Sequence, residues 1–243
     1  MFLGALIDLG ADLDVVRQAL APLPTDRPFE ITNQRVLRCG IGGIDLKVRA
    51  ASTAHHHHHT GHRQIMAMIE QLDTTDRAKT RAAKVVTLLA QAEARVHQTT
   101  VEHVHFHEVG AIDSIVDILG SAVALEQLEI TSLSCGVLPI SRGLVRCAHG
   151  QMPVPAPATA YLLQGMPTAG VDRAGELVTP TGAALAAGLC DHLGPPPPMI
   201  LEAVGYGAGD REDPDIPNLL RLMLGQQAST GPLTPAPAPG AIS

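Results

Sequence analysis

The chain has 243 residues, enough for one large domain or two small ones with a real core. Apolar residues make up 45% of it and aromatic residues only 2%, without tryptophan, so the core must be built from Ala, Val, Ile and Leu. A stacking platform for single-stranded nucleic acid needs exposed aromatic rings and is therefore not expected. The formal net charge of −7 argues against binding to a phosphate backbone.

Helical and strand-like patterns alternate in the first half of the chain. In residues 10–24, Asp12 lies near the start, apolar residues follow at helical spacing, and prolines end the segment, which predicts a helix. Two alternating runs around a glycine turn in residues 29–50 predict a hairpin. Beyond a histidine run, helical spacing resumes with Thr60 as the expected N-cap. Residues 73–98 combine a charged first half with an apolar stripe, which predicts a long helix.

The second half continues this alternation and predicts an α/β fold, a mixed sheet flanked by helices with a His-rich loop; α+β is the alternative. One domain is expected over residues 1–225, because residues 226–243 are rich in Pro and Ala and predict a disordered linker or tail. The expected elements are a strand at 101–109, a helix at 111–128, a strand at 132–140, a Pro-rich loop opening a helix at 152–165, a small-residue helix at 179–194, and strands at 199–209 and 218–225.

The cysteines lie far apart and form no C-x-x-C pair, which fits a reducing compartment better than a disulfide scaffold. Of these, Cys39 and Cys190 are expected in the core. No segment reaches the roughly 18 apolar residues of a membrane span. The first residues lack the basic region of a signal peptide and reach Asp8 too early. These features predict a cytoplasmic protein.

The stretch EHVHFHEVGAIDSIVD concentrates side chains that bind metals. His103, His105 and His107 recur with period two, so on a strand they would share one face. Neighbouring Cβ atoms on that face lie roughly 7 Å apart, and two imidazoles at that spacing can reach one metal ion. Glu108 would point to the other face or into the following turn. The stretch predicts a bidentate imidazole site completed by ligands from elsewhere.

Carboxylates and a thiol further along the chain are candidate additional ligands. Asp113 and Asp117 are four residues apart on one helix face, and a carboxylate there could orient a ligating imidazole. Asp113 is also a candidate N-cap. Cys147 and His149 are a candidate pair of a soft ligand and an imidazole on a loop, although a lone cysteine is more often a small buried residue.

A helix start later in the chain is a candidate anion site. Thr179, Thr181 and Gly182 open a predicted helix, whose N–H groups and hydroxyls could hold a phosphate or carboxylate. Ordinary threonine capping is the competing interpretation. The sequence GYGAG at residues 205–209 predicts a flexible glycine turn and is too loose for a nucleotide-binding fingerprint.

The blocks HVHFHEVGAIDSIVDILG, CAHGQMPVPAPAT, ELVTPTGAALAA, GYGAG and PNLLRLMLG follow one another in this chain up to about Gly225. In this order they resemble the LarC family of nickel-insertion proteins. The resemblance implies nickel insertion into pyridinium-3,5-bisthiocarboxylic acid mononucleotide, the precursor of the lactate racemase cofactor, driven by CTP hydrolysis with Mn or Mg. Nickel ends bound by two sulfurs and a ring carbon, so a ring proton must be lost. By position, Glu108 or His107 is the candidate base.

Two departures from that family bear on function. Family members usually carry a strand and a Gly-rich turn ahead of the helix with which this chain begins. Either the start codon is misassigned or the first strand is lost, and its loss is expected to expose a sheet edge. The family's C-terminal CTP-binding domain is also absent, so CTP-driven turnover is expected only together with that domain, supplied separately or by a frameshifted product. The sequence does not decide the oligomeric state, and a homo-oligomer is one alternative.

A run of five histidines precedes the predicted helix after residue 60, where the family also carries variable His-rich loops. An expression tag, a tolerated low-complexity loop and a metal reservoir are the alternatives. Natural-looking sequence on both sides and a second histidine cluster favour a mobile nickel-collecting loop. The run consists of His55, His56, His57, His58 and His59.

Three functional hypotheses follow. The leading one is a nickel chelatase of the lyase class, or its metal-handling half. The alternative is a nickel storage or delivery module without chemistry of its own. The third and weakest hypothesis is a metal-dependent hydrolase that uses His105, His107 and Asp113.

Overall fold

The computed structural model describes residues 1–23, 28–50, 60–104, 106, 112–147 and 150–228. The helices are α1 (Phe2–Asp8), α2 (Leu13–Leu20), α3 (His62–Glu70), α4 (Asp76–His97), the 3-10 helix η1 (Val101–His103), α5 (Ile112–Gln127), α6 (Pro157–Leu162) and α7 (Pro180–Leu189). The strands are β1 (Phe29–Arg38), β2 (Ile41–Ala50), β3 (Ser134–Cys135), β4 (Leu138–Arg142), β5 (Leu144–Cys147), β6 (Gly150–Pro153), β7 (Thr168–Ala174), β8 (His192–Leu193), β9 (Met199–Ala208) and β10 (Leu219–Gln227).

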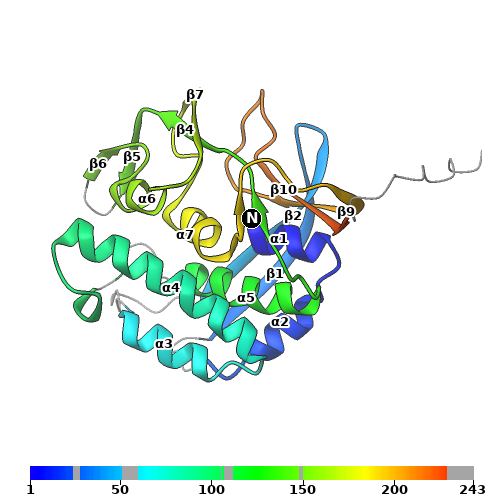
Figure 1. Cartoon of the computed structure of the whole chain (residues 1–243), viewed down its shortest axis with the longest axis horizontal. Helices are drawn as coiled ribbons and strands as arrows, with labels where there is room; N and C mark the ends of the chain where they lie inside the picture. The colour runs from blue at the N-terminus through cyan, green and yellow to red at the C-terminus, as the bar shows by residue number, and fades with distance from the viewer. Residues whose placement is uncertain (24–27, 51–59, 105, 107–111, 148–149, 229–243) are drawn as a thin grey trace, which may run out of the picture.

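A four-stranded mixed sheet in the order β1-β2-β9-β10 forms one side of the molecule (Figure 1). Two antiparallel hairpins, β1–β2 and β9–β10, are joined by a parallel contact in which Ile44 lies opposite Gly207. Shorter strand pairs, β4–β7, β5–β6 and β3–β8, lie outside this sheet. The predicted α/β class with a mixed sheet flanked by helices is confirmed.

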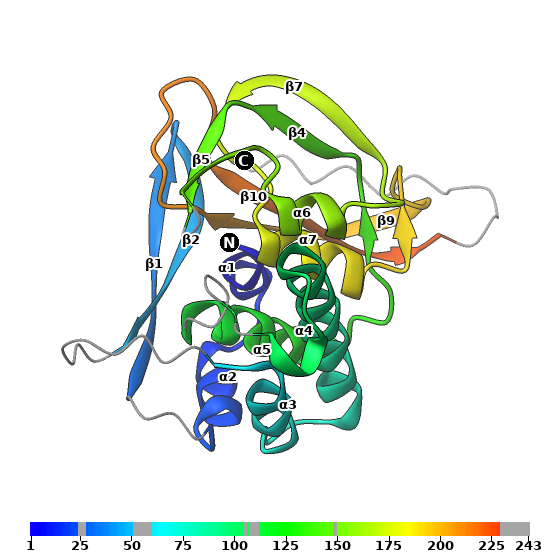
Figure 2. The ribbon, with the colours of Figure 1, turned by 90° about the vertical axis from the view of Figure 1, so that its left-hand side faces the viewer.

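Helices pack on the sheet around a core of small and aliphatic residues. Helix α1 contacts β2, β9 and α5, and Figure 2 shows it between the sheet and α5. Almost every residue of α5 from Ile115 to Leu125 is buried, because α1, α2 and α4 surround it. Helix α4 buries only the stripe that includes Val85, Val86 and Leu89. No helix among the described residues is both long and apolar enough to cross a membrane.

The sequence GYGAG does not form the predicted turn; most of it belongs to β9 and lies under α1. A Cβ atom added to Gly205 would lie 2.4 Å from the carbonyl oxygen of Ala5, so only glycine lets the two backbones approach this closely. Asp8 then ties the end of α1 to the sheet. Its Oδ2 accepts a hydrogen bond from the Tyr206 N–H at 2.8 Å, and its Oδ1 pairs with Arg35 at 2.6 Å.

Other local predictions have mixed outcomes. The helix within 10–24 is confirmed, with Asp12 accepting a hydrogen bond from the Asp14 N–H as its N-cap. Thr60 is not the cap of α3; Gly61 is, and Gln64 accepts its N–H instead. Cys39 is exposed rather than in the core, because it sits at the tip of the β1–β2 hairpin with a φ of +47°. Strand β10 extends to Gln227, and the predicted tail from residue 229 onward lies outside the described residues.

Candidate metal centre

The start of the histidine motif is a 3-10 turn rather than the predicted strand. Helix α4 ends at His97, its C-cap Gln98 adopts the left-handed conformation, and Val101–His103 then form η1. Val104 and Phe106, at 2% and 1% exposure, are pinned in the core, while His103 remains at the surface. Within the described residues, the exposed His103 therefore precedes two buried apolar residues, and the strand expected from residue 101 does not begin there.

His103 is oriented by its own turn. Its Nδ1 lies 2.9 Å from the Thr100 hydroxyl, which leaves Nε2 as the nitrogen for a metal. A hydrogen bond from its own backbone N–H, and a second one from Thr100, hold the pKa of the neighbouring Glu102 below its usual range. A ring nitrogen held by a second partner presents the other nitrogen in a defined direction, as ligating histidines commonly do.

The N-terminus of α3 lies against this turn and brings His62 to the same place. Helix α3 contacts η1, and a Cβ atom on Gly61 would lie 3.6 Å from the carbonyl oxygen of Val104. Burial lowers the pKa of His62, and the nearby Glu102 carboxylate partly opposes this. The Nε2 atom of His62 is buried and has no hydrogen-bond partner among the described residues. Such an atom is costly to bury unless something binds it.

Sequence reasoning passed over His62 because it followed a more conspicuous run. A signal was present: His62 is three residues before Ile65 and seven before Ile69, so all three share the buried face of α3. The structure therefore places His62, which follows the run of five histidines, near η1, which contains His103, the first histidine of the second cluster.

The two aspartates lie in the first turns of α5. Asp113 is exposed, and its Oδ1 accepts a hydrogen bond from the Ser114 N–H at 2.8 Å, so it helps to satisfy the helix start. Burial raises the pKa of Asp117; the Met1 amino group lowers it in part, and Asp113 raises it further. Over the described part of the chain, no three His, Cys, Asp or Glu side chains are close enough to hold a metal together.

The remaining predicted ligands are separate from this turn or outside the described residues. Cys147 is in the β5–β6 hairpin, where its thiol donates to the Gly150 carbonyl oxygen at 3.4 Å. The predicted residues that lie outside the described ranges are His55, His56, His57, His58, His59, His105, His107, Glu108 and His149.

The predicted anion site has the geometry of an ordinary helix cap. Thr179 is the N-cap of α7, and its hydroxyl accepts the Gly182 N–H at 3.1 Å, which uses the N–H group that an anion would need. Thr181 follows in the first turn and is half-buried.

Replacing Thr179 by alanine is expected to lower the free energy of unfolding by about 1 kcal/mol, because the Gly182 N–H loses its acceptor. Thr179→Ser is the matched control and should retain most of the stability. Urea unfolding followed by circular dichroism measures both variants. Unchanged stability in Thr179→Ala, with weaker binding of a phosphate-bearing ligand, would favour the anion site instead.

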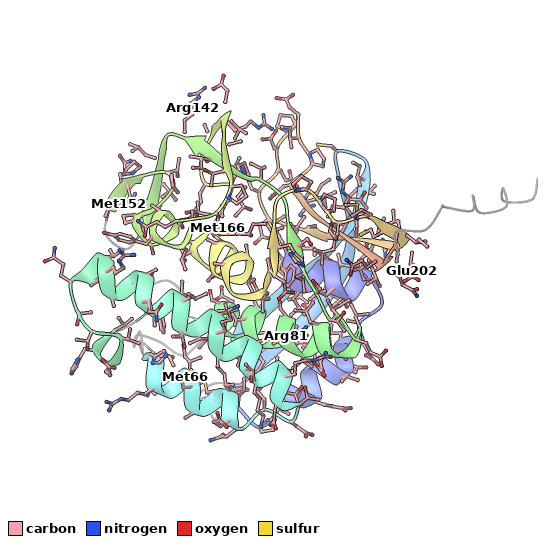
Figure 3. The ribbon with its side chains drawn as sticks, in the orientation of Figure 1. Met66, Arg81, Arg142, Met152, Met166 and Glu202 are labelled. Atoms are coloured by element: carbon pink, nitrogen blue, oxygen red, sulfur yellow. The ribbon has the colours of Figure 1, made fainter. Side chains whose placement is uncertain are left out.

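A cleft lies on the side of α4 away from α3. Its volume is about 420 Å³, and α4, α6 and α7 border it. Figure 3 shows Met166, one of its apolar lining residues, beside α6 and α7. Arg95 is the cationic lining group: its guanidinium lies 4.6 Å from the centre of the Tyr161 ring and donates to Gln164 at 3.0 Å. Most of the other lining residues are apolar, so the cleft suits a small ligand with apolar surface.

Comparison with known proteins gives consistent matches. The family described as nickel insertion protein matches residues 1–235. The pyridinium-3,5-bisthiocarboxylic acid mononucleotide nickel insertion protein of Staphylococcus epidermidis is 44% identical over 226 residues, 92% of this chain and 55% of that protein. A relative from Citrifermentans bemidjiense, whose name also refers to nickel insertion, is 47% identical over 226 residues, 93% of this chain and 58% of its own length.

The chain spans little more than half the length of these relatives. A further relative, from Geobacter sulfurreducens, is 44% identical over 227 residues, which are 93% of this chain and 58% of that protein. No solved structure matches the chain significantly.

Proposed function

The chain belongs to the nickel insertion protein family, and on that premise we propose that residues 1–225 are the metal-handling part of a nickel chelatase. The observation that carries this proposal is the contact of α3 with η1, which joins the two histidine-containing segments. The proposed acceptor is pyridinium-3,5-bisthiocarboxylic acid mononucleotide, named for the Staphylococcus epidermidis relative. The proposed compartment is the cytoplasm.

Nickel is a substrate in this proposal. Imidazole nitrogens of His62 and His103, with those of His105 and His107, would hold the ion before transfer to the softer thiocarboxylate sulfurs. Formation of the nickel–carbon bond releases a ring proton, for which Glu108 or His107 is the proposed base. Asp113 and Asp117, in the first turns of α5, are the proposed carboxyl groups that orient a ligating imidazole.

The energy source is proposed to lie outside this chain. CTP hydrolysis with Mn or Mg would take place in the part of the relatives' sequences that this chain does not cover.

The alternative function, nickel storage or delivery, is favoured by the run of five histidines, His55–His59, since clustered imidazoles suit several weak metal sites.

The first test is nickel stoichiometry and affinity, measured by native mass spectrometry and calorimetry. His62→Ala and the double variant His105→Ala with His107→Ala should each weaken one tight nickel by about tenfold or more, which is about 1.4 kcal/mol. Deletion of residues 55–59 should remove only weak ions. His192→Ala, which removes an exposed imidazole on β8, is the matched control and should bind as the unaltered protein does.

The opposite pattern would contradict the proposal. If the loop deletion abolishes all binding while His62→Ala and the double variant bind normally, the chain is a delivery module.

The insertion step needs its own assay, with the precursor, CTP, Mg and a separately made C-terminal domain. A metallated precursor is the expected product, and its absence where a full-length relative succeeds would reject the chelatase.

A further inference from the structure

Two cysteines far apart in the sequence meet where β3 and β8 pair. The parallel pairing places Cys135 opposite Leu193, and Cys190 ends α7 just before β8. Backbone hydrogen bonds hold this junction: the Gly194 N–H donates to the Cys135 carbonyl and the Asp191 N–H to the Leu133 carbonyl, both at 2.8 Å.

The strand pairing brings Cys135 and Cys190 to one junction, where each side chain shifts the pKa of the other, with a hydrogen bond between the thiols as the main cause; both residues are half-buried. The other two cysteines have different partners: the Cys39 thiol donates to the Asp213 carbonyl at 3.2 Å, and Cys147 donates to Gly150. A disulfide needs the two sulfurs to approach to about 2.05 Å, and the pairing of β3 with β8 holds the backbone segments that carry them side by side.

The hydrogen bond gives the two thiols unequal roles. Because Cys190 donates to it, the pKa of Cys135 falls to about 7, despite partial burial. The same bond, burial and the nearby Asp191 carboxylate raise the pKa of Cys190, while Lys84 opposes them. Cys135 is therefore the better nucleophile near neutral pH, and Cys190 is placed to attack second.

We propose that Cys135 and Cys190 form a dithiol modification site that reacts with small-molecule disulfides and closes reversibly to an intramolecular disulfide. The Cys135 thiolate attacks one sulfur of the small disulfide, forms a mixed disulfide and releases one thiolate. Cys190 gives its proton to solvent and attacks Sγ of Cys135, which releases the second thiolate. Two protein thiols are oxidised while one small disulfide is reduced to two thiols. Low-molecular-weight thiols reverse both steps.

The bond would join β3 to the end of α7 and thereby stiffen one wall of the cleft. Leu193 of β8 and Ala187 of α7 both line that cleft, beside Leu88 of α4. Closing a loop of about 55 residues also removes conformational entropy from the unfolded chain, so the oxidised protein should unfold at a higher temperature.

The test uses metal-free protein, so its result is independent of nickel insertion. The full chain is equilibrated in glutathione buffers of graded redox potential, and peptide mass mapping identifies the linked cysteines. A Cys135–Cys190 disulfide is expected, with a rise in unfolding temperature on the order of 5 °C or more. The matched control, Cys39→Ser with Cys147→Ser, should form the same bond. Cys135→Ser and Cys190→Ser should not.

A second measurement is the rate of alkylation by iodoacetamide against pH. Cys135 should react with a midpoint near pH 7 in the unaltered protein. In Cys190→Ser the midpoint should move toward about 8.5, because a serine hydroxyl is a weaker donor to the thiolate. A protein whose thiols stay reduced in oxidised glutathione, or which links other cysteines instead, would overturn the proposal.

Discussion

Replacing Gly205 by alanine is expected to lower the free energy of unfolding by about 3 kcal/mol or more, enough to unfold much of the protein at 37 °C. The added Cβ would lie 2.4 Å from the Ala5 carbonyl oxygen and 3.0 Å from the Leu9 nitrogen. Both are backbone atoms of α1 and its C-terminal cap, so the whole helix would have to move off the sheet. Thermal and urea unfolding measure the loss.

A matched control separates this clash from the general effect of a glycine in a strand. Gly170 lies in β7, and a Cβ atom there would meet nothing within 4 Å. Gly170→Ala should therefore change the free energy of unfolding by about 0.5 kcal/mol or less. Equal unfolding temperatures for the two variants would mean that α1 does not approach β9 as closely as described.

Replacing Phe106 by alanine should cost about 3–5 kcal/mol of unfolding free energy, as is typical when a buried aromatic side chain is removed. Phe106 is 1% exposed and heads the largest fully buried side chains of the described core. Its neighbours in sequence are His105 and His107, so the same change should also weaken tight nickel binding. Thermal unfolding and nickel titration measure the two effects.

Phe106→Leu is the control, because it keeps an apolar anchor of similar reach. It should lose about 1 kcal/mol and retain the tight nickel. If Phe106→Ala is as stable as the unaltered chain, the ring does not anchor the segment. If Phe106→Leu loses the nickel while staying folded, the ring contributes to the metal site by more than packing.

Much of the fold was predictable, because its signals are local. The alternation in residues 29–50 and the apolar stripe in 73–98 match the β1–β2 hairpin and α4, since each pattern depends on neighbours within a few residues. The errors came where tertiary contacts decide. GYGAG looked like a turn because glycine is common in turns, yet these glycines serve the close approach of α1. Residues 101–103 looked like the start of a strand, but they form η1, and the next described residues, Val104 and Phe106, are buried in the core.

By itself, the sequence determined the mixed α/β class, the family resemblance and the histidine-rich character of the chain, since composition, periodicity and short motifs are properties of the chain alone. Only the tertiary structure decided which distant residues meet. His62 reaches Glu102 because α3 packs on η1, and Cys135 reaches Cys190 because β3 pairs with β8. About 40 and 55 residues separate these partners, and such contacts depend on packing energies summed over the whole core, which no local pattern records.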